Sequence, residues 1–169
     1  MEPIFENRFY CSKTILKEFY RKVIFKCIPI LCVTETVILC CFVVHGLFFG
    51  IFLEMIPMYL MMAAVFSIGW LMPDWFVWNI MRQTKKQYDG EIPETTVTFG
   101  DTIELHEGMV HYTIPYQKIV RVIHLEHSYV LMIGKKNGII LAPDGFTEGT
   151  FGEFKEFLRR KRPDVLIPE

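Results

Sequence analysis

Cysteine is missing from most of this chain. All five cysteines of the 169 residues lie between Cys11 and Cys41, and residues 42–169 contain none. No two of them have the spacing of a zinc-binding or redox motif. This distribution argues against a disulfide framework, and we interpret the cysteines as helix-packing residues, with lipid attachment at Cys11 or Cys27 as the alternative.

Motifs of catalysis are also missing. No serine, histidine and aspartate occur in the context of a nucleophile turn, and Gly145–Gly149 lacks the lysine of a phosphate-binding loop. The histidines of the C-terminal half have no cysteine near them and no clear ligand pair two residues apart; they are His106, His111, His124 and His127. We therefore expect no enzyme, no catalytic residue, no cofactor and no metal.

The pairing expected for these histidines also disfavours a metal site. The dipeptide Glu107-Gly108 predicts a two-residue hairpin turn. Such a turn would place His106 opposite Met109 and Glu104 opposite His111. We interpret the histidines as solvated strand residues rather than zinc ligands.

Positive charge is scarce in the second half of the chain. Residues 88–169 contain nine basic and thirteen acidic side chains, a net charge of −4, whereas residues 1–26 contain six basic and three acidic ones, a net charge of +3. Nucleic-acid binding needs a basic face, so we expect no nucleic-acid partner. The N-terminal segment is instead suited to anionic lipids of the inner membrane leaflet.

Long hydrophobic runs are abundant. Residues 27–49 and 52–71 are each long enough to cross a bilayer, which takes about 20 apolar residues. Gly46, Gly50 and Pro57 interrupt them, which favours a tight reversal near residue 50. Because the remaining chain is too short to cover two such helices, we predict a transmembrane helical hairpin over residues 27–78.

The distribution of lysine and arginine predicts the orientation of this hairpin. Basic residues precede the first span, and Arg82, Lys85 and Lys86 follow the second, whereas the turn has neither lysine nor arginine. By the positive-inside rule, both termini are expected on the cytoplasmic side of a multi-pass protein. Trp70, Trp75, Phe76 and Trp78 would form the aromatic belt at the inner interface. The first span begins too late for a cleavable signal peptide.

Three polar residues of the hairpin are candidate intramembrane residues: Glu35, His45 and Glu54. Glu35 falls near the middle of the first span, where a carboxyl group is costly. We interpret it as a protonated residue that is hydrogen-bonded across the hairpin, with Thr34, Thr36 and Ser67 as candidate partners. His45 and Glu54 flank the turn and are expected to pair.

The C-terminal part predicts a small α+β domain. Six short strands are expected in residues 94–141, in antiparallel order, followed by a helix that Thr150 and Glu153 cap and that Phe151, Phe154, Phe157 and Leu158 anchor. This outline is pleckstrin-homology-like. The predicted organisation is a basic amphipathic juxtamembrane segment over 1–26, the hairpin, a linker over 79–93 and a cytoplasmic domain over 94–165.

Several exposed basic residues are candidate contacts for lipid or for a partner protein. The alternative is that these side chains are simply exposed to solvent on a helix face, in a loop or at a helix end, and bind nothing. The candidates are Lys13, Lys17, Arg21, Lys22, Lys135, Lys136, Arg159 and Arg160.

The segments Ile114–Val122, Ile139–Pro143 and Gly145–Leu158 together resemble the C-terminal domain of YcxB-like bacterial membrane proteins. The resemblance implies a bacterial plasma-membrane protein with two membrane helices before such a domain, and it implies no activity. The expected function is a non-enzymatic interaction module with an unknown protein partner, in bacteriocin immunity or envelope-stress protection by analogy. The alternative is a subunit of a homo-oligomeric transporter or channel in which Glu35 lines the membrane path.

Overall fold

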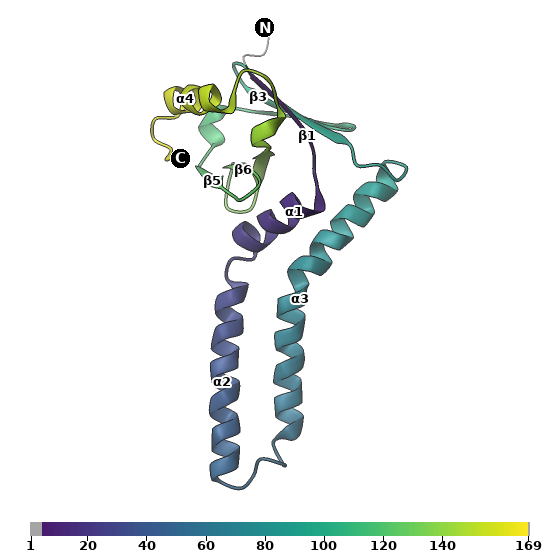
Figure 1. The fold of residues 1–169 in the computed structure, drawn as a ribbon, viewed down its shortest axis with the longest axis vertical. Helices are drawn as coiled ribbons and strands as arrows, with labels where there is room; N and C mark the ends of the chain where they lie inside the picture. Colours follow the sequence, from purple (N-terminus) through teal and green to yellow (C-terminus); the bar gives the residue numbers. More distant parts are fainter. Residues whose placement is uncertain (1–4, 169) are drawn as a thin grey trace.

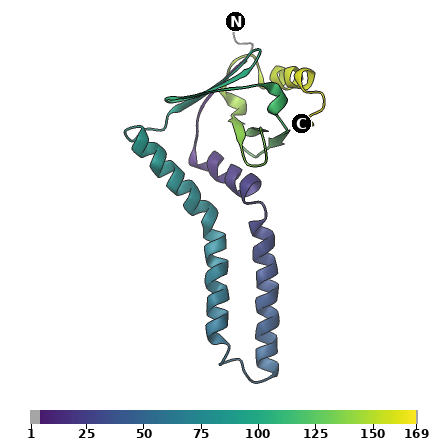
Figure 2. The ribbon, with the colours of Figure 1, turned by 180° about the vertical axis from the view of Figure 1, so that it is seen from behind.

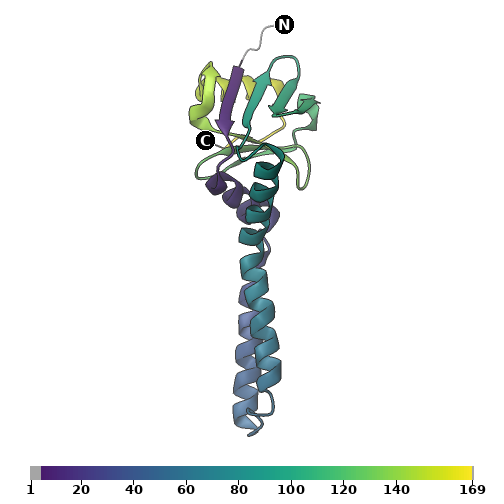
Figure 3. The ribbon, with the colours of Figure 1, turned by 90° about the vertical axis from the view of Figure 1, so that its right-hand side faces the viewer.

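A pair of long helices carries a sheet-rich domain at one end. The computed structural model describes residues 5–168. Figures 1 and 2 show the domain above the helix pair, with α1 lying between them. Seen from the side, the two long helices form a narrow stalk (Figure 3).

The stalk consists of α2 (Ile28–Phe48) and α3 (Ile56–Gln87), which a short turn joins. The turn contains Gly50 in the left-handed conformation, with a φ of 72°. Both helices are long and apolar enough to span a membrane, and only 11% and 6% of their most apolar stretches are buried. Their apolar side chains are therefore not covered by the rest of the protein. Helix α3 carries the buried Pro73 in its interior and continues through much of the segment that we expected to be linker.

The larger sheet has five strands in the order β4-β3-β2-β1-β8. Their bounds are β1 Phe5–Tyr10, β2 Glu94–Phe99, β3 Ile103–Glu107, β4 Val110–Ile114 and β8 Phe146–Glu148. Strand β1 pairs along its full length with β2, from Phe5 opposite Phe99 to Tyr10 opposite Glu94. The domain thus begins before the stalk, and both long helices lie in the connection between β1 and β2.

A second sheet and a helix complete the domain. The strands β5 (Arg121–His124), β6 (Tyr129–Met132) and β7 (Gly138–Leu141) form a three-stranded antiparallel sheet. Helix α4 (Phe151–Lys161) begins with the predicted capping box of Thr150 and Glu153. The fold therefore contains the six expected strands, and β1 and β8 in addition.

The main core lies between the two sheets and α4. It contains Phe99 and Ile103 of the larger sheet, Leu131 and Leu141 of the smaller one, and Phe154 of α4. Phe5 of β1 packs on the rings of Phe154 and Phe157, with centroids 5.8 and 5.3 Å away. A side chain at position 149 would collide with the Phe5 ring, so the glycine at this position, just before α4, leaves space for Phe5 of β1.

The N-terminal segment differs from its prediction. We expected a basic amphipathic juxtamembrane segment over residues 1–26, separate from the domain. Residues 5–10 are instead a strand, and helix begins only after the Ser12 cap, as α1 (Lys13–Phe19), which a π-helical turn over Tyr20–Ile24 continues. The alternating residues Phe5 and Asn7 are buried, and pairing with β2 and β8 overrides the helical spacing.

The turn of the β3–β4 hairpin lies one residue later than predicted, which shifts the strand pairing by two residues. Glu107 pairs with Val110, so Gly108 and Met109 form the turn. Gly108 takes the positive φ of 56° that such a turn needs, and Tyr88 packs against it. His106 consequently lies opposite His111, and Glu104 lies opposite Thr113, so the predicted pairing was wrong.

Candidate functional site

The most highly organised polar region is the junction between stalk and domain, which we call the neck. It comprises α1 with the following turn, the middle of α3, and the loop between β5 and β6. Its charged side chains are Lys17, Glu18, Arg21, Lys22, Asp74 and Glu126.

Glu18 ties α1 to the smaller sheet. Its carboxylate is almost fully buried and accepts hydrogen bonds from the backbone N–H groups of Glu126 (2.5 Å) and His127 (3.3 Å). Lys22 Nζ donates to the same carboxylate at 2.8 Å. Burial by itself raises the pKa of Glu18, but the hydrogen bonds from Lys22 and from the two backbone groups outweigh it and lower the pKa. Glu18 is therefore a charged anchor that accepts hydrogen bonds from the backbone N–H groups of the loop between β5 and β6.

Asp74 ties α1 to α3. Lys17 Nζ lies 2.7 Å from one of its carboxylate oxygens, and the Arg21 guanidinium lies 2.5 Å from the other. The two cations lie about one turn apart, Lys17 in α1 and Arg21 in the π-helical turn that continues it. The side chains are one third to two fifths exposed, so each ion pair alone contributes little stability, but the pairs set the direction of α1 across α3.

Apolar contacts reinforce these polar ones. Phe19 and Val23 pack beneath the smaller sheet on Leu125, Val130 and Met132, which form a second core cluster. On the other side, the Tyr20 ring lies 5.0 Å from the Phe76 ring of α3. All four residues of β6 are buried because the main core covers one face of this strand and α1 covers the other.

A small cavity opens at the stalk side of the neck. It has a volume of about 70 Å³ and is lined by Arg21, Phe25, Ile28, Pro29, Trp70 and Pro73. Pockets for small molecules usually have volumes of roughly 300–1,000 Å³. This cavity is therefore too small for a substrate site.

Several of the basic residues predicted to contact lipid or a partner instead form ion pairs with acidic residues of this chain. Lys17, Arg21 and Lys22 form the neck ion pairs, and Arg159 pairs with Glu156 within α4. The others are exposed and form no ion pair within the described residues 5–168: Lys13, Lys135, Lys136 and Arg160. Contact with lipid or a partner remains a prediction for this second group.

The predicted pairs within the stalk are not formed in the described part of the chain. Glu35 is half-buried on the side of α2 that also carries the buried Cys32. The hydroxyl groups of Thr34, Thr36 and Ser67 donate to backbone carbonyls of their own helices instead of to Glu35. A hydroxyl in a helix reaches the carbonyl one turn earlier more easily than a group on a neighbouring helix.

His45 and Glu54 are both exposed, and they form no ion pair in the structure as described. The His45 ring lies against Phe49 instead, with centroids 4.5 Å apart. The turn itself is held by Tyr59, whose hydroxyl donates to the Phe42 carbonyl at 3.1 Å.

Sequence reasoning missed Glu18, Asp74 and Asn7 as structural anchors. Asn7 is fully buried in β1, where its amide donates to the Ala142 carbonyl at 2.7 Å and its side-chain oxygen accepts from the Ala142 N–H at 3.2 Å. The isolated acid at the end of the second apolar run, Asp74, was a usable signal. Nothing near Asn7 or Glu18 in the sequence indicates partners more than 100 positions away.

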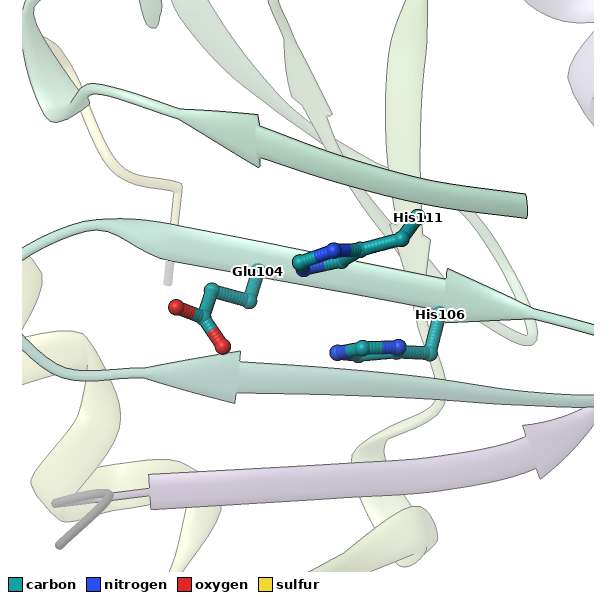
Figure 4. Close-up of side chains that lie close together, drawn as sticks. All are labelled: Glu104, His106 and His111. Carbon is teal, nitrogen blue, oxygen red and sulfur yellow. The ribbon is translucent and has the colours of Figure 1, made fainter. Parts of the chain in front are cut away.

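The histidines of the domain form two groups. His106 and His111 stack with ring centroids 4.0 Å apart, and Glu104 lies beside them on the same face of the larger sheet (Figure 4). His124 lies opposite Tyr129 and stacks on its ring at 4.3 Å. His127 contributes its backbone N–H to Glu18.

Comparison with known proteins supports the sequence resemblance. A family model described as YcxB-like protein matches residues 100–158, which extend from the start of β3 to α4. No curated protein and no solved structure matches the chain. The matched residues include both strands of the His106–His111 hairpin, the whole smaller sheet and most of α4, and they exclude the stalk, β1 and β2. Residues 100–158 of this chain are therefore similar to YcxB-like proteins, and this range includes the segments Ile114–Val122, Ile139–Pro143 and Gly145–Leu158 on which the sequence resemblance rests.

Proposed function

We propose that this chain is a multi-pass protein of the bacterial plasma membrane that holds a pleckstrin-homology-like interaction module at the cytoplasmic surface. The observation that carries the proposal is the contrast between the two parts. The stalk exposes its apolar side chains, whereas the domain has a closed core and is tied to one end of the stalk through the neck.

Charge and aromatic residues support the orientation. The lysines and arginines lie at the neck end and in the domain, whereas the turn at the other end has none. Trp70, Trp75 and Trp78 are about half exposed and lie on both sides of Asp74 in α3, at the level of the neck. Tryptophan is enriched at membrane interfaces, which favours placing the bilayer boundary at the neck.

The strand order supports the pleckstrin-homology-like assignment. Strands β1 to β4 are neighbours in chain order, β5 to β7 form a second antiparallel sheet, and a C-terminal helix covers the core. In this interpretation the membrane hairpin is an insertion between the first and second strands of the module. The neck would then keep the module in one orientation on the membrane.

The proposed role of the module is to bind a protein partner at the membrane rather than to catalyse a reaction. The exposed Lys135, Lys136 and Arg160 lie on the module and form no ion pair within the described residues 5–168, so they are available to a partner. Protection against a bacteriocin or against envelope stress is a candidate role by analogy with other small membrane proteins that carry such domains.

Cysteine labelling tests the membrane topology. In a variant without its five cysteines, we would introduce one cysteine at Leu53 in the stalk turn or at Lys135 in the domain, both exposed. A membrane-impermeant maleimide should label the first variant in intact cells, or in spheroplasts if an outer membrane is present, and the second only after lysis. Recovery of the protein in the soluble fraction, or labelling of the Lys135 position in intact cells, would refute the proposal.

Photocrosslinking in living cells tests the module. A photoreactive residue at Lys135, Lys136 or Arg160 should yield a discrete adduct of the same partner, whereas the same residue at Leu53 should not yield that adduct. If the module positions give no adduct, the interaction role is wrong even when the topology is correct.

A further inference from the structure

We propose that Glu104, His106 and His111 form a binding site for a divalent transition-metal ion, with Zn²⁺ as the best match, on the outer face of the larger sheet. Glu104 and His106 are two residues apart on β3, so their side chains leave the same face of the strand. His111 lies directly opposite His106 on β4. The hairpin register therefore brings together three potential ligands, two imidazoles and one carboxylate, from two strands.

The distances are close to those of a bound ion. One ligand atom of each side chain lies within 4.8 Å of the corresponding atoms of the other two. In a tetrahedral zinc site with bonds of about 2.1 Å, ligand atoms are separated by about 3.4 Å. Both imidazole rings are exposed, so small rotations about their side-chain bonds can close this difference without moving the backbone.

Figure 4 shows how the groups are directed. The two rings lie nearly parallel, with an interplanar angle of 12°, and the Glu104 carboxylate lies beyond their tips. Each imidazole has ring nitrogens that can bind a metal ion, and the Glu104 side chain offers a carboxylate oxygen beside them. This is an environment that attracts a cation.

The neighbouring side chains leave these ligands available. Within residues 5–168, no ion pair or hydrogen bond involves any of the three side chains. The nearest arginine on this face, Arg8 of β1, is paired with Glu6. The residues opposite Glu104 are Thr98 and Thr113, which are uncharged.

The donor set selects the kind of metal. Two imidazoles and one carboxylate are a common protein ligand set for zinc, and imidazole also binds Cu²⁺ and Ni²⁺. Mg²⁺ and Ca²⁺ prefer oxygen ligands throughout, so they are poor matches. Three protein ligands leave a coordination position for water or for a ligand from a partner.

Titration of the full-length protein with Zn²⁺ tests this site. Protein in detergent micelles, stripped of metal with a chelator, would be titrated with zinc chloride in a calorimeter. We expect one Zn²⁺ per chain. The variants His106→Gln and His111→Gln should each bind Zn²⁺ at least tenfold more weakly than the unaltered protein. The double variant should not lose a further tenfold relative to a single variant, because both histidines belong to the same site and either substitution already destroys it.

His124→Gln is the matched control, since His124 is also a histidine on a strand but has an aromatic ring instead of a second imidazole opposite. It should bind Zn²⁺ as the unaltered protein does. Equal melting temperatures of all variants in chelator would show that the exposed substitutions leave the fold intact. The proposal fails if His106→Gln and His111→Gln titrate like the unaltered protein, or if His124→Gln loses as much affinity, which would mean adventitious binding only.

Discussion

At the scale of single residues, Glu18 joins α1 to the smaller sheet of the domain. A buried carboxylate is unfavourable unless several donors surround it, and here two backbone N–H groups and Lys22 do so. Its partners lie 108 and 109 positions away in the sequence. From the sequence alone, Glu18 is one acidic residue in a basic helical segment, and its role as an anchor is visible only in the folded chain.

Glu18→Gln should destabilise the domain by about 1–3 kcal/mol, because an amide cannot replace a charged acceptor for several donors. The midpoint of thermal or denaturant unfolding, followed by near-ultraviolet circular dichroism, measures the loss. Glu126→Gln is the control, since the Glu126 carboxylate is exposed and lies 3.8 Å from Lys22. Equal midpoints for Glu18→Gln and the unaltered protein would contradict the anchoring role.

The same carboxylate makes stability depend on pH. Because the pKa of Glu18 is lowered in the folded protein, its contribution is fully present above the usual glutamate pKa of about 4.3 and is lost as the pH falls below it. We expect Glu18→Gln to flatten the decline of the unfolding midpoint between about pH 5 and pH 3. An unchanged decline in the variant would assign the acid sensitivity to other carboxylates.

At the scale of elements, β1 extends the domain to an N-terminal segment that precedes the stalk in the sequence. The sequence predicted a cytoplasmic unit from residue 94 onward, yet β1 lies inside the sheet, between β2 and β8, and contributes Phe5 and Asn7 to the interior. Without it, β2 would expose an unpaired edge and α4 would lose an aromatic contact. The domain therefore needs two separate segments of the chain.

A fragment of residues 94–169 should fail to fold cooperatively. A soluble protein in which residues 1–26 are joined to residues 86–169 by a flexible linker of about 15 residues, with a mean span of roughly 20 Å, should fold. Chemical-shift dispersion in NMR spectra and the cooperativity of thermal unfolding would compare the two. Cooperative unfolding of the shorter fragment at the same temperature would show that β1 is dispensable.

At the scale of the whole molecule, the neck fixes the domain relative to the stalk. Helix α1 contacts α3 through Asp74 on one side and the smaller sheet through Glu18 on the other. A connection of this kind would keep the same surface of the domain turned toward the stalk.

Asp74→Asn should loosen this connection without unfolding the domain. We expect faster backbone hydrogen exchange in α1, by several-fold, and an overall loss of stability of no more than about 1 kcal/mol, since the ion pairs are partly exposed. Mass spectrometry of the full-length protein after hydrogen exchange would measure the exchange rates in α1 and in the domain. Glu156→Gln, which removes an ion pair of α4, is the control and should leave exchange in α1 unchanged.

The sequence by itself determined the features that depend on neighbouring residues. Apolar length located the two long helices, alternation located six strands, and Thr150 with Glu153 located the start of α4, because each signal acts within a few positions. The tertiary structure decided the rest: that Phe5–Tyr10 is a strand, that Glu18 and Asn7 reach distant turns, and that His106 lies opposite His111. A strand register shifts by whole residues at little local cost, so only the contacts of the complete sheet select one.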